Sequence, residues 1–380
     1  GATLTIQDMD GNIVESWVST DTPHRMTGLH LGDAYTLTET RPADGYALAD
    51  DITFRLLQKV DEDGNNLQEA EVYYLTTKNF LFWTWDDWKL LDDATVIMRD
   101  DTIKVEISKK DLTTMEELPG AELTITDKDG KEIDRWVSSD KPHYIEKLPA
   151  GDYTLTEVKA PDGYAFAESV PFTVLPTGEV QQFEMLDDVI KVEISKKDLT
   201  TMEELPGAEL TLTDKDGKKI DRWVSSDKPH YIEKLPAGDY TLTEVKAPDG
   251  YAFAESVPFT VLPTGEVQQF EMLDDVIKVE ISKVDITTSK ELPGAELIIT
   301  NKDGKVVEHW TSTDKPHYIE KLPAGDYTLT EITAPDGYEI AENISFTVLP
   351  NGDVQRVVMK DAPIPEQPVQ PTPPSTPTPA

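Results

Sequence analysis

The chain contains no cysteine, so a disulfide cannot stabilise any part of it. It also contains no run of eighteen or more apolar residues, and no segment of this fragment is therefore expected to span a bilayer. Basic residues are scarce: 35 Lys and Arg face 73 Asp and Glu, for a formal net charge of -38. This charge repels nucleic acids and anionic membrane surfaces at long range, so we expect no nucleic-acid partner.

An internal repeat of 87 residues dominates what is present. Residues 103–189 and 190–276 differ only where Ile125 becomes Leu212 and Glu132 becomes Lys219. Eight prolines among the last eighteen residues favour an extended polyproline II spacer. The period predicts four consecutive domains and a tail, with these boundaries: residues 1–101, 102–188, 189–275, 276–362 and 363–380.

Each repeat consists of short segments that alternate apolar and polar residues, separated by turns rich in Gly and Pro. Asp127-Lys128-Asp129-Gly130 is one such turn, because Asp-Gly supplies the positive φ angles that tight hairpins need. No segment has the 3.6-residue period of a long helix. The regular spacing predicts an all-β sandwich for each repeat.

One predicted strand, residues 104–111, places a lysine on its buried face. Val105, Ile107 and Lys109 alternate with polar residues and so share that face. Two later strands aim a glutamate and an aspartate inward in the same way. Unpaired buried charges are costly, so these groups are expected to meet. The Lys–Glu–Asp trio recurs in three repeats: Lys109, Glu157 and Asp187; Lys196, Glu244 and Asp274; Lys283, Glu331 and Asp361.

Burial of such a trio favours the neutral forms of its groups, since desolvation lowers the pKa of an amine and raises that of a carboxyl group. A neutral amine held against a protonated aspartic acid can condense with it, while the glutamate moves protons. The product is a Lys–Asp isopeptide bond. A permanent ion cluster without chemistry is the alternative, because it perturbs pKa values in the same way.

The first repeat departs from this pattern in two ways. Glu39 and Asp100 match the glutamate and the aspartate, but no lysine of residues 1–101 matches the donor, so Asp100 is expected to be an unpaired acceptor. An insertion at about residues 60–93 predicts a β-hairpin whose turn is Thr76-Thr77-Lys78-Asn79. Its aromatic residues are candidate ligand-binding residues, although the hairpin could instead cover a sheet edge or pack on the next repeat. They are Tyr73, Tyr74, Trp83, Trp85 and Trp88.

Other motifs do not suggest a cofactor, a metal or an external substrate. His143, His230 and His317 recur once per repeat, each without a second ligand nearby, and they are expected to pack in turns. No phosphate-binding glycine loop or Ser/His/Asp order is present. We therefore expect no metal, no cofactor and no enzyme beyond single-turnover condensation.

Four stretches of the second repeat together resemble Cna B-type domains, also called SpaA-like or prealbumin-like, of Gram-positive surface adhesins and pilins. They are Val-Glu-Ile-Ser-Lys-Lys-Asp (105–111), Leu-Pro-Gly-Ala-Glu-Leu (118–123), Tyr-Thr-Leu-Thr-Glu-Val-Lys-Ala-Pro-Asp-Gly-Tyr (153–164) and Phe-Glu-Met-Leu-Asp (183–187). The resemblance implies tandem transthyretin-like β-sandwiches that form isopeptide bonds spontaneously. By position it makes each inward lysine the donor, each glutamate the assisting residue and each inward aspartate the acceptor.

The resemblance also implies a function and a location. The expected function is that of a structural stalk in an adhesin, extracellular and anchored to a Gram-positive cell wall. The alternatives are an adhesin module that binds through the aromatic insertion, and a minor pilin subunit. A ligand on a host or neighbouring cell is the expected partner. Peptidoglycan is a second one, reached through a sortase anchor that is missing here, and the proline tail resembles the wall-spanning segment that precedes such an anchor.

Overall fold

A computed structural model describes residues 1–80 and 83–365, without the side chains of residues 79, 80 and 83. The described residues form strands, turns and irregular segments, and the predicted all-β fold is confirmed. Over these residues no helix has the length and apolar character needed to cross a membrane. The predicted proline-rich spacer lies almost wholly outside the described residues.

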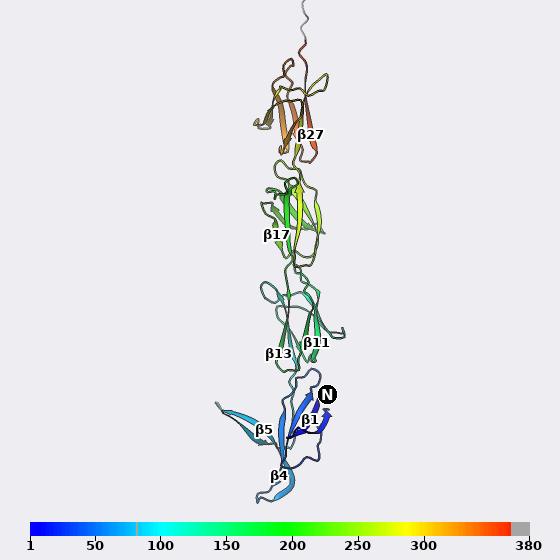
Figure 1. Cartoon of the computed structure of the whole chain (residues 1–380), viewed down its shortest axis with the longest axis vertical. Helices are drawn as coiled ribbons and strands as arrows, with labels where there is room; N and C mark the ends of the chain where they lie inside the picture. The colour runs from blue at the N-terminus through cyan, green and yellow to red at the C-terminus, as the bar shows by residue number, and fades with distance from the viewer. Residues whose placement is uncertain (81–82, 366–380) are drawn as a thin grey trace, which may run out of the picture. The chain divides into compact units, whose positions relative to one another are not determined.

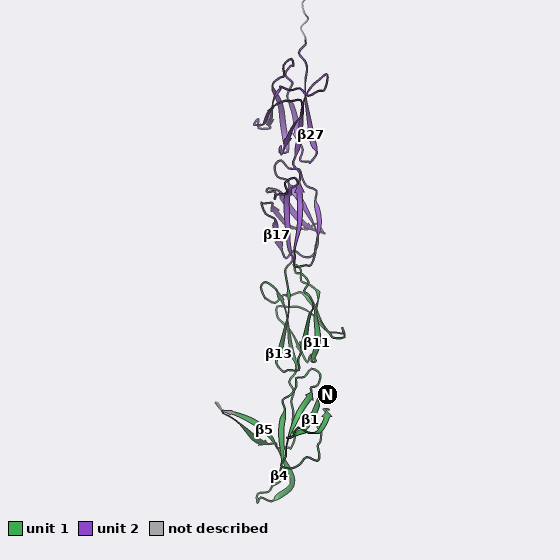
Figure 2. Cartoon of the chain, in the orientation of Figure 1, with its two compact units in different colours: residues 1–189, 263–265 green, residues 190–262, 266–380 purple. Residues whose placement is uncertain are grey.

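The chain divides into two compact units, shown in different colours in Figure 2. One unit comprises residues 1–189 with 263–265, and the other comprises residues 190–262 with those from 266 onward. Each unit thus contains essentially two sequence repeats. The finer domain boundaries that the repeat predicts stay a prediction.

The second, third and fourth repeats share one topology, a three-stranded sheet facing a four-stranded sheet. Figure 1 labels β13 in the former and β11 in the latter for the second repeat. The strands of the second repeat are β7 (Lys104–Asp111), β8 (Glu122–Asp127), β9 (Glu132–Val137), β10 (His143–Glu146), β11 (Gly151–Lys159), β12 (Val170–Val174) and β13 (Val180–Asp187). Those of the third are β14 (Lys191–Asp198), β15 (Glu209–Asp214), β16 (Lys219–Val224), β17 (His230–Glu233), β18 (Gly238–Lys246), β19 (Val257–Val261) and β20 (Val267–Asp274). Those of the fourth are β21 (Lys278–Asp285), β22 (Glu296–Asn301), β23 (Val306–Thr311), β24 (His317–Glu320), β25 (Gly325–Thr333), β26 (Ile344–Val348) and β27 (Val354–Asp361).

The first and last strands of each of these repeats are neighbours and run parallel. In the second repeat the three-stranded sheet has the order β10-β7-β13, and β7 pairs with β13 over its whole length. The four-stranded sheet has the order β12-β11-β8-β9 and is antiparallel. The inward faces of both sheets form one core, to which Val105, Ile107, Leu123, Leu155 and Met185 contribute.

The Asp-Gly turn of the second repeat forms where the sequence predicts it. The Asp127 carboxylate accepts hydrogen bonds from the backbone N–H groups of Asp129 and Lys131, both at 2.9 Å. Gly130 has φ +79°, a backbone conformation that residues with a side chain adopt only with strain. His143, which was expected in a turn, instead begins β10, and its ring stacks on Trp136 at 4.2 Å.

The first repeat has a single six-stranded sheet of order β2-β1-β3-β4-β5-β6. Its strands are β1 (Thr3–Asp8), β2 (Ile13–Val18), β3 (Ala34–Arg41), β4 (Ile52–Val60), β5 (Asn66–Phe80) and β6 (Trp83–Leu90). Residues 95–100, the counterpart of β13, form no strand, since no described strand of this repeat takes the position of β7 beside them. Val96 and Met98 nevertheless pack against the core.

The insertion is a hairpin, but its predicted turn is wrong. Thr76, Thr77, Lys78 and Asn79 lie within β5, and the connection to β6 falls at residues 81–82, outside the described residues. Thr77 donates a hydrogen bond to Asp86 at 3.2 Å, and Lys78 forms an ion pair with Asp87. These residues lie in an exposed two-stranded ribbon, where polar side chains pair across the strands. Their composition therefore resembles that of a turn. Figure 1 shows β5, beyond the part that pairs with β4, extending away from β1.

Candidate functional site

The parallel pairing of first and last strands brings the lysine to the aspartate. Lys109 of β7 is paired with Met185 of β13, and Asp187 is the next residue of β13 on the same face. Two residues of a strand span about 6.6 Å, a distance that a lysine stem can cover along the sheet. Glu157 approaches from β11 of the facing sheet, where it follows Tyr153 and Leu155 on the buried face.

All three predicted trios are assembled in the described structure. Lysine Nζ donates to Asp187 Oδ1 in the second repeat, to Asp274 Oδ1 in the third and to Asp361 Oδ1 in the fourth. The same amines lie 2.9, 3.1 and 2.8 Å from Oε1 of Glu157, Glu244 and Glu331. The side chains of all nine residues are at most 2% exposed, so each trio is sealed from solvent.

The environment of the aspartates favours the protonated acid. Burial raises the pKa of Asp187 and of Asp274 to about 7, although the neighbouring lysine opposes the shift. Burial likewise raises the pKa of Asp361. In all three, Oδ2 is buried and has no hydrogen-bond partner among the described residues, so a charge on it would be poorly stabilised.

A backbone amide that the sequence did not reveal holds each glutamate. The N–H of Ala167 donates to Glu157 Oε2 at 2.8 Å, and Ala254 donates to Glu244 Oε2 at the same distance. Ala341 does so for Glu331 at 2.6 Å. With Oε2 fixed, Oε1 faces the amine. A constant offset of ten residues between the glutamate and the alanine is the signal that could have pointed to this contact.

The first repeat holds two members of a trio. Glu39 is 2% exposed and accepts a hydrogen bond from the Ala49 N–H at 2.8 Å. Burial raises its pKa, the Ala49 amide partly opposes this, and nearby Asp100 adds to the rise. Glu39 Oε1, which would face a donor amine, is buried without a hydrogen-bond partner in the described part of the chain. The predicted acceptor Asp100 therefore lies beside Glu39.

The candidate ligand-binding aromatics fall on two faces of the hairpin. Trp85 is 48% exposed, and its cross-strand partner Lys78 places it on the face of Tyr74. Trp88 lies on the other face with Tyr73, and the Arg55 guanidinium sits 4.2 Å from the Trp88 ring centre. The side chain of the fifth predicted residue, Trp83, lies outside the described part of the structure. The four described side chains therefore lie on two faces of the hairpin and do not form one continuous platform.

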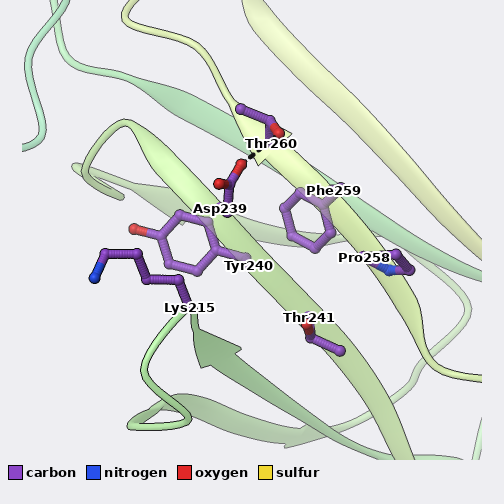
Figure 3. A pocket seen from close by; sticks show the side chains of 7 residues that line it. All are labelled: Lys215, Asp239, Tyr240, Thr241, Pro258, Phe259 and Thr260. Carbon is purple, nitrogen blue, oxygen red and sulfur yellow. Dashed lines mark hydrogen bonds between the residues drawn. The ribbon is translucent and has the colours of Figure 1, made fainter.

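The two larger surface pockets among the described residues contain no member of a trio. A shallow pocket of about 230 Å³ in the third repeat is drawn in Figure 3, where the rings of Tyr240 and Phe259 lie beside Asp239, which accepts a hydrogen bond from Thr260 at 2.6 Å. The second repeat has an equivalent pocket of about 240 Å³. A smaller cavity of about 100 Å³ reaches Lys109 beneath the Trp136–His143 stack. Within each trio, the lysine, glutamate and aspartate side chains thus contact one another rather than an open cleft.

The family model for the SpaA prealbumin-like fold domain matches four segments, residues 1–67, 103–188, 190–275 and 277–363. The chain belongs to the SpaA prealbumin-like domain family. The gap between the first two SpaA segments contains most of the aromatic insertion. The sequence-based recognition of the family is confirmed.

Two similar proteins are much longer than the segments that match this chain. Colossin-A of Dictyostelium discoideum is 24% identical over 261 residues, which cover 57% of this chain and 2% of that protein. A collagen adhesin of Staphylococcus aureus is 25% identical over 172 residues, covering 42% of this chain and 14% of the adhesin. The chain therefore spans a small part of either relative.

Two of the solved structures that this chain resembles come from Bacillus species. The Bacillus anthracis TIE protein is 23% identical, with 94% of this chain and 66% of that chain covered and a TM-score of 0.40. BcpA, the major pilin subunit of Bacillus cereus, is 14% identical, with 69% and 99% covered and a TM-score of 0.31.

Proposed function

We propose that this chain is a stalk segment of a Gram-positive surface adhesin, in which the second, third and fourth repeats each form a Lys–Asp isopeptide bond. The observation that carries the proposal is the contact of one buried amine with two buried carboxyl groups, repeated in three cores. We propose an extracellular location with attachment to the cell wall, and the similarity to a collagen adhesin of Staphylococcus aureus supports it.

The proposed reaction consumes only groups of the chain itself. A proton moves from the ammonium group of Lys109 to the carboxylate of Asp187, with Glu157 as the carrier. The neutral amine attacks Cγ of the acid, a C–N bond forms, and the C–O bond to the protonated oxygen breaks. Glu157 takes the second proton that the attacking nitrogen loses and delivers it to the departing oxygen, so ammonium and carboxylate become one amide and one water. The sealed core supplies proximity, which makes an otherwise negligible condensation feasible.

The bond would take the role that disulfides have in other small extracellular domains. Lys109 and Asp187 are 78 residues apart in the chain. Closing a loop of that length stabilises a domain by about 4–5 kcal/mol in the chain-entropy model. That is comparable with the whole stability of a small domain.

Intact-mass spectrometry of the chain tests the proposal. Three bonds predict a mass below the sequence mass by about 54 Da, three waters of about 18 Da each. Replacing Glu157, Glu244 and Glu331 by alanine is expected to abolish the deficit, so that the variant has the mass of its own sequence. Lys110→Met is the control, because it changes the solvent-facing neighbour of Lys109 that pairs with Glu184, and it is expected to keep the deficit. A chain with the full sequence mass would contradict the bond and leave the ion-cluster alternative.

A second candidate function is ligand binding by the aromatic hairpin, favoured by the 48% exposure of Trp85. Collagen is a reasonable first probe because one relative is named a collagen adhesin. If the hairpin binds it, the chain will bind immobilised collagen in surface plasmon resonance and Trp85→Ala will weaken binding at least tenfold. Equal responses of the two chains would reject this assignment.

A further inference from the structure

Consecutive repeats within each compact unit meet at a recurring contact. In the second unit, the Gly250-Tyr251 turn of the third repeat meets Lys321 of the fourth. In the first unit, the Gly45-Tyr46 turn meets Lys147 of the second repeat. The glycine and tyrosine end the Ala-Pro-Asp-Gly-Tyr stretch in the third repeat, and the proposed cross-link gives them no role.

Backbone hydrogen bonds run through the contact in the same order in both units. Ile277 donates to the Gly250 carbonyl at 2.9 Å, and Lys321 donates to the Ile277 carbonyl at 3.0 Å. In the first unit Ile103 donates to Gly45 at 3.0 Å, and Lys147 donates to Ile103 at 2.8 Å. The isoleucine that begins the later repeat is thus held between two turns.

The fit at the glycine leaves no room for a side chain. Gly250 has φ +87°, and a Cβ atom there would lie 2.6 Å from the Lys321 carbonyl oxygen. Gly45 has φ +84°, and a Cβ atom at this position would likewise lie 2.6 Å from the Lys147 carbonyl oxygen. Gly337 of the fourth repeat also has φ +87°, but nothing lies within 4 Å of a Cβ there. The short distance to a backbone carbonyl therefore arises from the contact between repeats and not from the conformation of the turn itself.

Side chains extend the contact into the first strand of the third repeat. Lys321 Nζ donates to the Tyr251 hydroxyl at 2.6 Å, and that hydroxyl donates to Asp198 Oδ2 at 2.7 Å. Lys321 Nζ is also 3.5 Å from Asp198 Oδ2. Asp198 ends β14, two residues after Lys196. Hydrogen bonds thus connect the fourth repeat to the strand that carries the third repeat's donor lysine.

We propose that the Gly-Tyr turn of one repeat is a docking socket for the lysine turn, Lys-Leu-Pro-Ala-Gly, of the repeat that follows, and that it fixes the angle between the two repeats. The partner of this surface is a second copy of the repeat. The glycine admits the backbone of the lysine turn, and the tyrosine binds the amine. The inference does not depend on the isopeptide bonds.

Double electron–electron resonance on the full chain tests this directly, because the chain has no cysteine and two labels can be placed cleanly. Asp227→Cys and Asp314→Cys put nitroxides on equivalent exposed positions of the third and fourth repeats. We expect a narrow distance distribution. Gly250→Ala is expected to broaden it at least twofold, while Gly337→Ala, which carries the same φ strain without the close approach, leaves it unchanged.

A milder pair of variants guards against local misfolding. Tyr251→Phe removes the hydroxyl between Lys321 and Asp198, whereas Tyr338→Phe removes only a 2.7 Å bond to Asp285 within the fourth repeat. Broadening by the first and not by the second supports the socket. A broad distribution in the unsubstituted chain, or equal effects within both pairs, would overturn it.

Discussion

Lys109 is 2% exposed in a core of aliphatic side chains, a position that a lone ammonium group could not occupy without a large desolvation cost. The cost is offset by Asp187 and Glu157, which themselves would be unfavourable there without the amine. Every member of the trio therefore depends on the other two. This mutual dependence makes single substitutions informative, and the nearly identical second repeat provides an internal reference for changes in the third.

The chemistry of the acceptor can be tested with Asp274→Asn. An amide at this position is expected to react with Lys196 by loss of ammonia, giving the same product as loss of water from the acid. Peptide mass spectrometry should find a linked peptide identical in mass to the wild-type one. Asp274→Ala, which has no carbonyl to attack, should leave Lys196 unlinked. An unlinked Asn variant would show that the carboxylic acid itself is required.

The role of the Ala254 amide can be tested by removing its hydrogen. Ala254→Pro eliminates the N–H that fixes Glu244 Oε2 at 2.8 Å, so the glutamate is expected to lose its orientation. The unlinked fraction of the third repeat should rise at least tenfold in peptide mass spectrometry. Ala254→Gly retains the N–H and serves as the control. Equal linkage in both variants would mean that the amide does not position Glu244.

At the scale of the strand, the period-2 pattern of residues 104–111 was enough to predict which side chains face inward, because one buried face imposes it. The Asp-Gly turn at 127–130 was equally predictable from its φ requirement. The hairpin turn at 76–79 was not, since polar cross-strand pairs and turns have similar compositions. The hydrogen bond from the Ala167 N–H to Glu157 was not predicted either, because every residue except proline has a backbone N–H and the residue type does not indicate where that group donates.

Cross-linking of β14 to β20 predicts strong local stabilisation of the third repeat. Glu244→Gln is expected to leave Lys196 and Asp274 unlinked and to cost about 4–5 kcal/mol of unfolding free energy. At 1.4 kcal/mol per factor of ten, the slowest amides of the third repeat should exchange with deuterium about a thousandfold faster. Those of the second repeat should not change. Unaltered exchange in both repeats would contradict a stabilising bond.

At the scale of the whole molecule, the stability of the contact between the third and fourth repeats is expected to depend on pH through Asp198. The Tyr251 hydroxyl, with two backbone amides and Lys321, lowers the pKa of Asp198 to about 2. In an unfolded chain an aspartate titrates near 3.9. The stabilisation from this contact is therefore complete above about pH 4 and is lost as the pH falls toward 2.

The same spin-labelled chain can measure this response. The distance distribution between positions 227 and 314 is expected to be narrow at pH 5 and to broaden between about pH 4 and 2, as Asp198 is protonated. Tyr251→Phe should be broad already at pH 5 and change little on acidification. Circular dichroism at each pH checks that the sandwiches stay folded. A distance distribution that stays narrow at pH 2 would show that protonation of Asp198 does not loosen the contact between the repeats.

The parallel pairing of β7 with β13 also bears on how such a gene can change. Because these strands run in the same direction, the chain enters a repeat at one end of the sandwich and leaves at the opposite end, with its lysine and aspartate both inside. Two adjacent stretches of 87 residues differ at only two positions, so unequal recombination between them adds or removes a whole self-sufficient module in frame. Copy number can thus vary among descendants without any new interface having to be invented.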